Sequence, residues 1–235
     1  MPIADLRNSR IDAFIASFAI RLRGRGTSVA LTLWLLSSVL LSACGAPEPA
    51  QRDRFYSLAP QLQSPPAASA PLRATLLVND LAARGFLGGR QIVFRTSEQP
   101  LEVQRYNLLL WEEPPGRAIA GQLAAGLRTA GLFEFVVTPA QRTRADYILS
   151  GEIDRFEHLP TAGPPKVVAE FSLTLLQGTN RRSLFSGRYH GQEETGGDSP
   201  EAMARAFNRL AGRLIGDALR DLQSQRTRLR AAPGR

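Results

Sequence analysis

The chain has 235 residues, with 29 lysines and arginines against 21 aspartates and glutamates, and a formal net charge of +8. The excess is concentrated at the two ends. Residues 1–43 carry five arginines and two aspartates, and residues 226–235 carry four arginines and no acid, so the stretch between them is close to neutral. Nucleic-acid-binding domains keep a basic face on their folded part, and composition therefore argues against nucleic acid as a partner.

Residues 1–43 are predicted to be an N-terminal extension and a secretory signal peptide. Three arginines between positions 21 and 25 precede a charge-free run, residues 26–47, whose apolar centre is Val29–Leu41. That centre has about 13 residues, short of the roughly 20 that a spanning helix needs, so a cleaved signal is favoured over an uncleaved membrane helix. Because the basic stretch begins so late, either the start codon is assigned too early or the n-region is unusually long.

A short motif closes this segment. Leu41, Ser42, Ala43 and Cys44 resemble the bacterial lipobox, in which the cysteine thiol receives a diacylglyceryl group and becomes the new N-terminus after cleavage. The small residues give the peptidase access to the backbone, and the thiol is the nucleophile that takes the lipid. A buried structural cysteine is the alternative, but the glycine- and proline-containing segment that follows cannot continue a core element. The next residue is Gly45, not aspartate, which favours sorting to the outer membrane.

The lipid on Cys44 is the only attached group that the sequence predicts. Cys44 is the sole cysteine, so the mature chain would have no disulfide and no thiol for a metal or for nucleophilic catalysis; no cofactor and no metal are expected. We predict a lipidated tether over residues 44–54, a single α/β domain over residues 55–225 and a basic, disordered tail over residues 226–235. The tail would be solvated or, as a weaker alternative, would contact anionic lipid head groups.

The first half of the domain is predicted to contain short strands and one glycine-rich turn. The strand candidates are Phe55–Leu58, Ala74–Leu81, Gln91–Arg95, Leu101–Trp111 and Phe133–Thr138. A phosphate-binding loop between the second and third would need a Gly-Lys-Ser/Thr sequence and a following helix, and the sequence has neither. We predict instead a turn that contacts a partner, formed by Gly85, Phe86, Leu87, Gly88, Gly89 and Arg90.

The second half combines helices with three long strands in an antiparallel meander. Ile119, Leu123 and Leu127 recur at helical spacing and predict a helix that ends near Gly131. In the middle strand of the meander, four apolar residues alternate with polar ones and predict one buried face. These four are Ala169, Phe171, Leu173 and Leu175.

The final helix is predicted over Pro200–Gln225. Ser199 is a good capping residue, and proline suits the first helical position. Its apolar face, which includes Phe207, Leu210 and Leu214, should cover the buried face of the meander. Membrane association by this helix is the alternative, but its polar face mixes arginines with aspartates and favours packing against the sheet.

Catalytic arrangements are not apparent in the sequence. Neighbouring residues on a strand point to opposite faces, so neither Glu112–Glu113 nor Glu193–Glu194 forms a natural acid/base pair. The two histidines, His158 and His190, lie in separate segments, and no serine has the spacing of a nucleophile elbow. We therefore predict that the chain is not an enzyme.

The order of these pieces resembles the ABC-type transport auxiliary lipoprotein family, whose members accompany ABC transporters with MCE-domain subunits that move lipids between membranes. The resemblance covers about Arg54 to Leu222. It is carried by the lipobox, a set of short strand motifs and the C-terminal helix. The motifs are Phe55–Leu58, Arg90–Arg95, Tyr106–Trp111 running into Glu112-Glu113-Pro114, and Ala145–Gly151.

The resemblance implies a mixed, largely antiparallel sheet with two main helices packed against it, and no catalysis. It implies an outer-membrane lipoprotein that faces the periplasm and docks an MCE-domain protein and its ABC transporter subunits. A homo-oligomer is compatible with it, because edge strands near Phe55 or Phe133 can pair between subunits. The alternative function is a lipoprotein that regulates an envelope enzyme, such as a cell-wall synthase, although the short tether argues against it.

Overall fold

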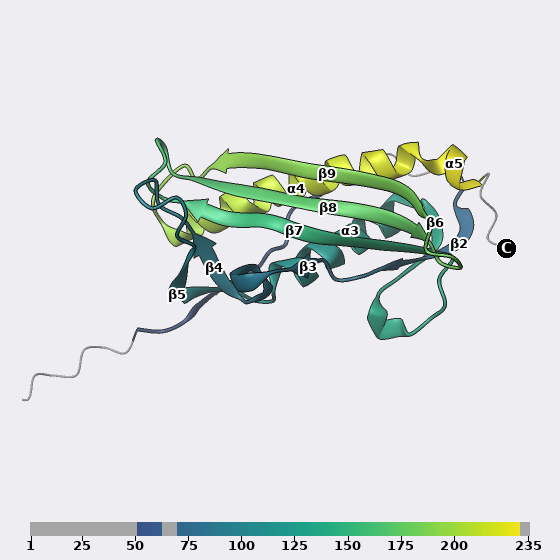
Figure 1. Cartoon of the computed structure of the whole chain (residues 1–235), viewed down its shortest axis with the longest axis horizontal. Helices are drawn as coiled ribbons and strands as arrows, with labels where there is room; N and C mark the ends of the chain where they lie inside the picture. The colour runs from purple at the N-terminus through teal and green to yellow at the C-terminus, as the bar shows by residue number, and fades with distance from the viewer. Residues whose placement is uncertain (1–50, 63–69, 231–235) are drawn as a thin grey trace, which may run out of the picture. The chain divides into compact units, whose positions relative to one another are not determined.

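The computed structural model describes residues 51–62 and 70–230, and its central feature is the predicted meander of three long strands (Figure 1). The strands run antiparallel, β7 against β8 and β8 against β9. Their bounds are Tyr147–Leu159 for β7, Lys166–Gln177 for β8 and Ser183–Glu194 for β9. The signal segment, Cys44 and most of the predicted tether lie outside the described residues.

Three of the shorter strands also pair with β7, each in parallel orientation. β2 joins its first half, β3 its middle and β4 its second half. β6 then pairs with β2 in parallel, β5 with β4 in antiparallel orientation, and β1 with β5 in parallel. These strands are β1 Arg54–Tyr56, β2 Leu72–Val78, β3 Ala82–Ala83, β4 Gln91–Phe94, β5 Gln104–Trp111 and β6 Phe133–Val137.

The predicted fold class is confirmed as a mixed α/β architecture. Parallel pairs are the more numerous, but the antiparallel ladders of β7–β8–β9 are by far the longest. Figure 1 shows β2 and β6 at the right-hand end of these long strands and β4 and β5 at the left-hand end. The two ends of the sheet are therefore built from different short strands. In the strand order β1-β5-β4-β7-β2-β6, the terminal strands are β1 and β6.

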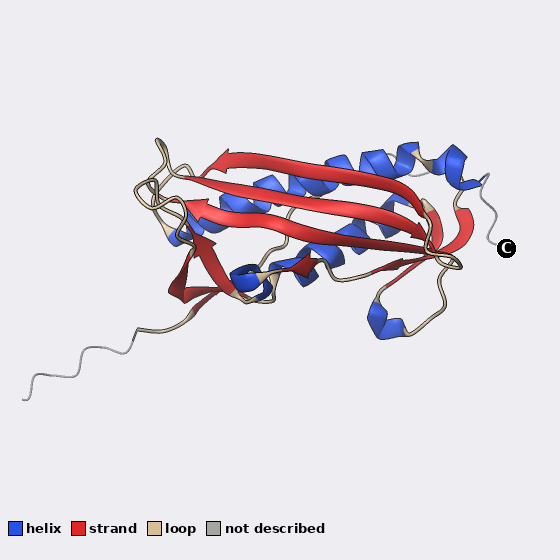
Figure 2. Cartoon of the chain, viewed as in Figure 1, coloured by secondary structure: helices blue, strands red, loops and turns tan. Residues whose placement is uncertain are grey.

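Two long helices lie behind the meander in Figure 2, on one face of the sheet. They are α3, Pro115–Ala130, and α4, Pro200–Ser224. α4 begins as predicted, because the Ser199 side chain accepts a hydrogen bond from the Ala202 amide at 3.1 Å. α3 ends as predicted at Gly131, whose φ of 59° lies in the left-handed region that glycine adopts without strain. Two short 3₁₀ turns complete the elements, η1 at Gly85–Gly88 and η2 at Pro139–Gln141.

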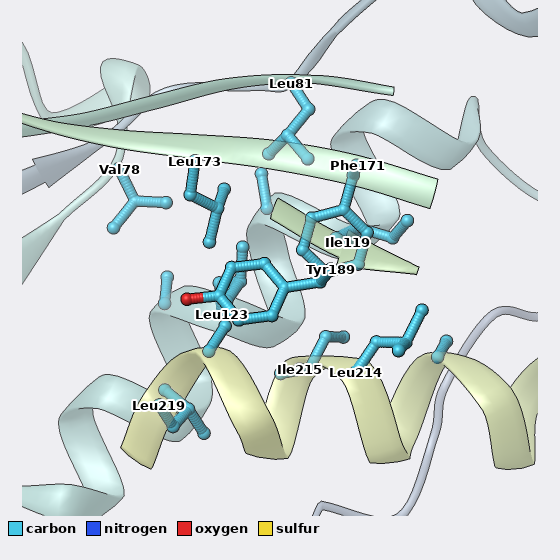
Figure 3. Close-up of a cluster of buried hydrophobic side chains, with 14 of the residues drawn as sticks. Val78, Leu81, Ile119, Leu123, Phe171, Leu173, Tyr189, Leu214, Ile215 and Leu219 are labelled. Carbon is cyan, nitrogen blue, oxygen red and sulfur yellow. The ribbon is translucent and has the colours of Figure 1, made fainter. Parts of the chain in front are cut away.

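The core lies between the sheet and these helices, and Figure 3 shows part of it. The predicted alternation is confirmed: in β8, Ala169, Phe171, Leu173 and Leu175 are buried, while the residues between them are partly exposed. The α4 residues expected opposite them are also buried, and Phe207 has no exposed surface. Apolar side chains of α3, such as Leu123, close the same cluster.

The predicted disorder of the C-terminal tail is wrong for residues 226–230. These residues form a further helical turn, α5, Arg226–Arg230. Leu229 is buried in the core, and its carbonyl accepts a hydrogen bond from the buried Tyr147 hydroxyl at 3.1 Å. Arg226 also bonds to the carbonyl of Ala70. The prediction from charge failed because one apolar residue among the arginines, Leu229, is enough to anchor this turn to the core.

In residues 51–62 and 70–230, no helix is both long enough and apolar enough to cross a membrane.

Candidate functional site

The predicted lipidation site lies outside the described residues. This applies to Cys44 and to the peptidase recognition residues Leu41, Ser42 and Ala43, whose roles stay predictions. The described chain begins at residue 51 and enters the sheet as β1, beside β5. The first described element is therefore the one nearest in sequence to the proposed anchor.

The predicted contact loop, residues 85–90, forms the turn η1 between β3 and β4. Gly85 has a φ of 56°, a backbone conformation that favours glycine. Leu87 packs against the core, whereas Phe86 remains 45% exposed. The element that follows is strand β4, as predicted. The turn thus has one apolar residue that fixes it to the domain and one that faces solvent.

Two arginines lie over two exposed aromatic rings at or near this turn. Arg90 lies over the ring of Phe55, 5.0 Å from its centroid, and Arg105 lies over the ring of Phe86 at 4.9 Å. We call Phe55, Phe86, Arg90 and Arg105 the arginine–aromatic face. Cation–π contacts at exposed sites contribute about 0.5–1 kcal/mol each, enough to bias side-chain orientation.

Strand pairing and two hydrogen bonds position parts of this face. Phe55 of β1 and Gln91 of β4 both lie opposite Leu110 of β5, so all three side chains share one face of the sheet. Arg105, earlier on β5, donates to the Gln91 side-chain oxygen at 3.1 Å. Arg90 donates through Nε to the carbonyl of Trp111 at 3.1 Å. These bonds hold both guanidinium groups against the sheet beside the rings.

Exposed apolar residues are concentrated at this end of the sheet. Four large apolar side chains in the described residues are exposed: Phe55 at 53%, Phe86 at 45%, Leu101 at 94% and Phe135 at 57%. The first two belong to the arginine–aromatic face, and Leu101 lies in the loop that joins β4 to β5. Phe135 lies on β6, at the other end of the strand order. The loop that the sequence selected therefore contains one of these four exposed apolar residues, Phe86.

The buried histidine is part of a neutral polar pair. The Tyr106 hydroxyl lies 2.8 Å from Nδ1 of His158, and Nε2 of His158 has no partner among the described residues. Burial lowers the pKa of His158 to about 4 and raises the pKa of Tyr106 to about 12. Both groups are therefore uncharged near neutral pH, and neither is suited to proton transfer there.

In each glutamate pair considered as an acid/base candidate, one carboxylate is bound by other side chains. Glu112 accepts a hydrogen bond from Ser57. Glu193 accepts hydrogen bonds from Arg209 and Arg213, each at 2.9 Å, and the bond from Arg209 holds the pKa of Glu193 below its usual range. Within residues 51–62 and 70–230, no group of three or more histidine, cysteine, aspartate or glutamate side chains could hold a metal ion.

A buried carboxylate belongs to a polar cluster that the sequence did not suggest. Glu157 is only 3% exposed and accepts hydrogen bonds from Nε of Arg95 at 2.7 Å and Nε of Arg155 at 2.9 Å. Arg95 and Arg155 lie far apart in the sequence and meet at Glu157 because β4 pairs with the end of β7. This pairing is non-local, and no motif marks it in the sequence.

A hollow beside α4 is lined by three arginines and is a possible site for an anion. Arg209, Arg213 and Arg220 line it together with Gln61 and two glycines. Arg209 and Arg213 are held by Glu193, and Arg220 is paired with Asp217. Because each arginine already has an acidic partner, the hollow has no strong attraction for an anion.

Comparison with known proteins assigns the chain to a family. A family model described as an ABC-type transport auxiliary lipoprotein component matches residues 56–217. The chain belongs to this family. It is therefore an auxiliary lipoprotein component of ABC-type transport, a class of cell-envelope proteins. No curated protein matches the sequence.

Solved structures share the fold at low sequence identity. The crystal structure of protein XCC0632 from Xanthomonas campestris is similar with a TM-score of 0.64 and 20% identity, over 75% of this chain and 99% of that one. The crystal structure of an uncharacterized protein is similar with a TM-score of 0.56 and 17% identity, over 73% and 99%. The PelC dodecamer from Paraburkholderia phytofirmans is more distant, with a TM-score of 0.43 and 18% identity, over 68% and 93%.

Proposed function

We propose that the chain is a non-catalytic outer-membrane lipoprotein that docks the periplasmic part of an MCE-type ABC lipid-transport system. Lipid on Cys44 would anchor it, and the domain would face the periplasm. The observation that carries the proposal is the family match over residues 56–217, joined to the lipobox at residues 41–44.

The state of the polar side chains supports a role without catalysis. The His158–Tyr106 pair is neutral, and the buried Glu157 is neutralised by two arginines. Glu193 is held in the same way by arginines of α4. Groups that are uncharged near neutral pH, or held in ion pairs, are poorly suited to transfer protons to or from a substrate.

The edge of β6 is the surface that we propose for the transporter. Among the described strands, β6 pairs only with β2, and its Phe135 is 57% exposed. An exposed strand edge can accept a strand from another chain, with main-chain hydrogen bonds for affinity and an apolar side chain for specificity. The same property would allow a second copy to pair at the terminal strands β1 or β6.

Affinity isolation of the full lipidated chain from cross-linked, detergent-solubilised membranes tests the proposal. We expect an MCE-domain protein and ABC transporter subunits in the isolate. Phe135→Glu should reduce their recovery, because it places a charge on the docking edge. Leu101→Glu, which also replaces an exposed apolar residue with glutamate but lies in the loop between β4 and β5, is the matched control. Recovery of a cell-wall synthase without transporter subunits would contradict the proposal and favour the regulatory alternative.

A further inference from the structure

We propose that the arginine–aromatic face lies on the membrane and binds anionic phospholipid head groups, so that the domain is held in one orientation above its anchor. The proposal rests on the lipid anchor of the proposed function, because a nearby bilayer is required. It names the bilayer as the partner of the contact loop at residues 85–90. The transporter would then use the opposite end of the sheet.

The chemistry of the face suits the interfacial region of a bilayer. Aromatic side chains are enriched at the level of lipid head groups, and arginine places its stem along apolar surface while its charge remains in a polar layer. Phe55 and Phe86 are both about half exposed, and each has a guanidinium group over its ring. Each aromatic–arginine pair thus offers an apolar surface and a phosphate-binding cation together.

The charge around the face has the sign that anionic lipids require. The two segments that contribute its aromatic residues, 52–55 and 84–90, contain four arginines and one acid, Asp53. Arg54 and Arg84 are paired with Glu201 and Glu152. Among the described residues, Arg90 and Arg105 have no carboxylate partner. Their positive charge is therefore available to a phosphate, unlike that of the arginines in the hollow beside α4.

The position of the face in the chain makes the bilayer its nearest surface. Phe55 is eleven residues after Cys44, so even a fully extended tether spans only about 40 Å at 3.3–3.6 Å per residue. The tether ends at β1, and β1 itself contributes Phe55 to the face. A transporter subunit would also find this surface apolar, but short distance to the anchor and unpaired cations together favour lipid.

Fluorescence quenching in vesicles tests this orientation with the full lipidated chain. Cys44 is the only native cysteine and its thiol would carry lipid, so one introduced cysteine is a unique labelling site once intact mass has established lipidation. Phe86→Cys reports on the proposed face. Phe135→Cys is the matched control, because it also replaces an exposed phenylalanine, at the other end of the strand order. The vesicles contain phosphatidylethanolamine, phosphatidylglycerol and a lipid with a nitroxide near its head group.

We expect strong quenching of the label at position 86 and none above background at position 135. Quenching at position 86 should be lost in phosphatidylcholine vesicles and in the double variant Arg90→Gln, Arg105→Gln, although the protein still floats with the vesicles. Protein that floats while both labels stay unquenched would overturn this inference and leave the anchor standing. Equal quenching of the label at position 86 in phosphatidylcholine vesicles would show that the face does not select anionic lipid. If the chain with Cys44 intact carries no lipid and does not float with the vesicles, both the proposed anchor and this inference would be overturned.

Discussion

Phe207 shows how a single side chain joins the last helix to the sheet. It has no exposed surface, stacks on Phe156 with ring centroids 4.6 Å apart and meets the edge of Trp111 at 5.2 Å. Phe207→Ala should lower the free energy of unfolding by about 3–5 kcal/mol, because it opens a cavity in a close-packed layer. Urea denaturation of the purified protein measures the change. Phe135→Ala, at an exposed position, should cost under about 0.5 kcal/mol; similar losses for both would contradict the packing.

His158 should make the protein sensitive to acid. Its folded-state pKa is lowered to about 4, below the usual value near 6.5. Between these two pH values the unfolded chain binds a proton that the folded chain excludes, so stability falls as pH drops from about 6.5 towards 4. The loss should be on the order of 2 kcal/mol, after allowance for solvent that reaches the ring.

Substitution of the two histidines separates this effect from general acid denaturation. His158→Gln should flatten the dependence of unfolding free energy on pH between about 6.5 and 4. His190→Gln is the control, because it replaces a histidine whose side chain is exposed. Denaturation curves at several pH values across this window provide the measurement. An unchanged slope in His158→Gln would show that another group carries the proton uptake.

At the scale of elements, sequence patterns predicted those features that depend on interactions within one segment. Period-two alternation identified β8, and the capping Ser199 identified the start of α4, because burial and capping act within one segment. The parallel pairing of β7 with β2, β3 and β4 could not be predicted, since it depends on contacts between distant segments. The position of the turn at residues 85–90 could be predicted, because its glycines are a local signal. The contact of Arg105 with Phe86 could not, because it depends on the pairing of β4 with β5.

α5 is the element on which the composition misled us, and it leads to a prediction. Leu229 is only 2% exposed, and its carbonyl satisfies the hydroxyl of Tyr147. Leu229→Ala should lower the free energy of unfolding by about 2–3 kcal/mol, because it removes buried methyl groups at the margin of the core. Arg228→Ala, on an exposed neighbour, should change it by less than about 0.5 kcal/mol. Thermal or urea denaturation that fails to distinguish the two variants would contradict a docked α5.

At the scale of the whole molecule, the two ends of the sheet have different surfaces. The end with β1, β4 and β5 carries the arginine–aromatic face, whereas the end with β6, which pairs only with β2 among the described strands, has one exposed phenylalanine. A protein that bridges a membrane and a transporter needs two such surfaces, separated so that one partner does not cover the other. The long strands β7, β8 and β9 provide that separation, because they run between the two ends (Figure 1).

The anchor sets the strength of membrane attachment, and Cys44→Ser tests it. Each buried methylene contributes about 0.8 kcal/mol, and two or more acyl chains make attachment durable. The arginines of the arginine–aromatic face would add only about 1 kcal/mol each, enough to orient the domain but too little to retain it.

Cys44→Ser should therefore leave the outer-membrane fraction, and transporter support should fall although the fold is intact. Ser42→Ala keeps a small residue in the lipobox and should behave as wild type. Membrane fractionation with intact mass decides the matter: an unlipidated wild-type chain, or a Cys44→Ser chain that still floats with outer membrane, contradicts the anchor.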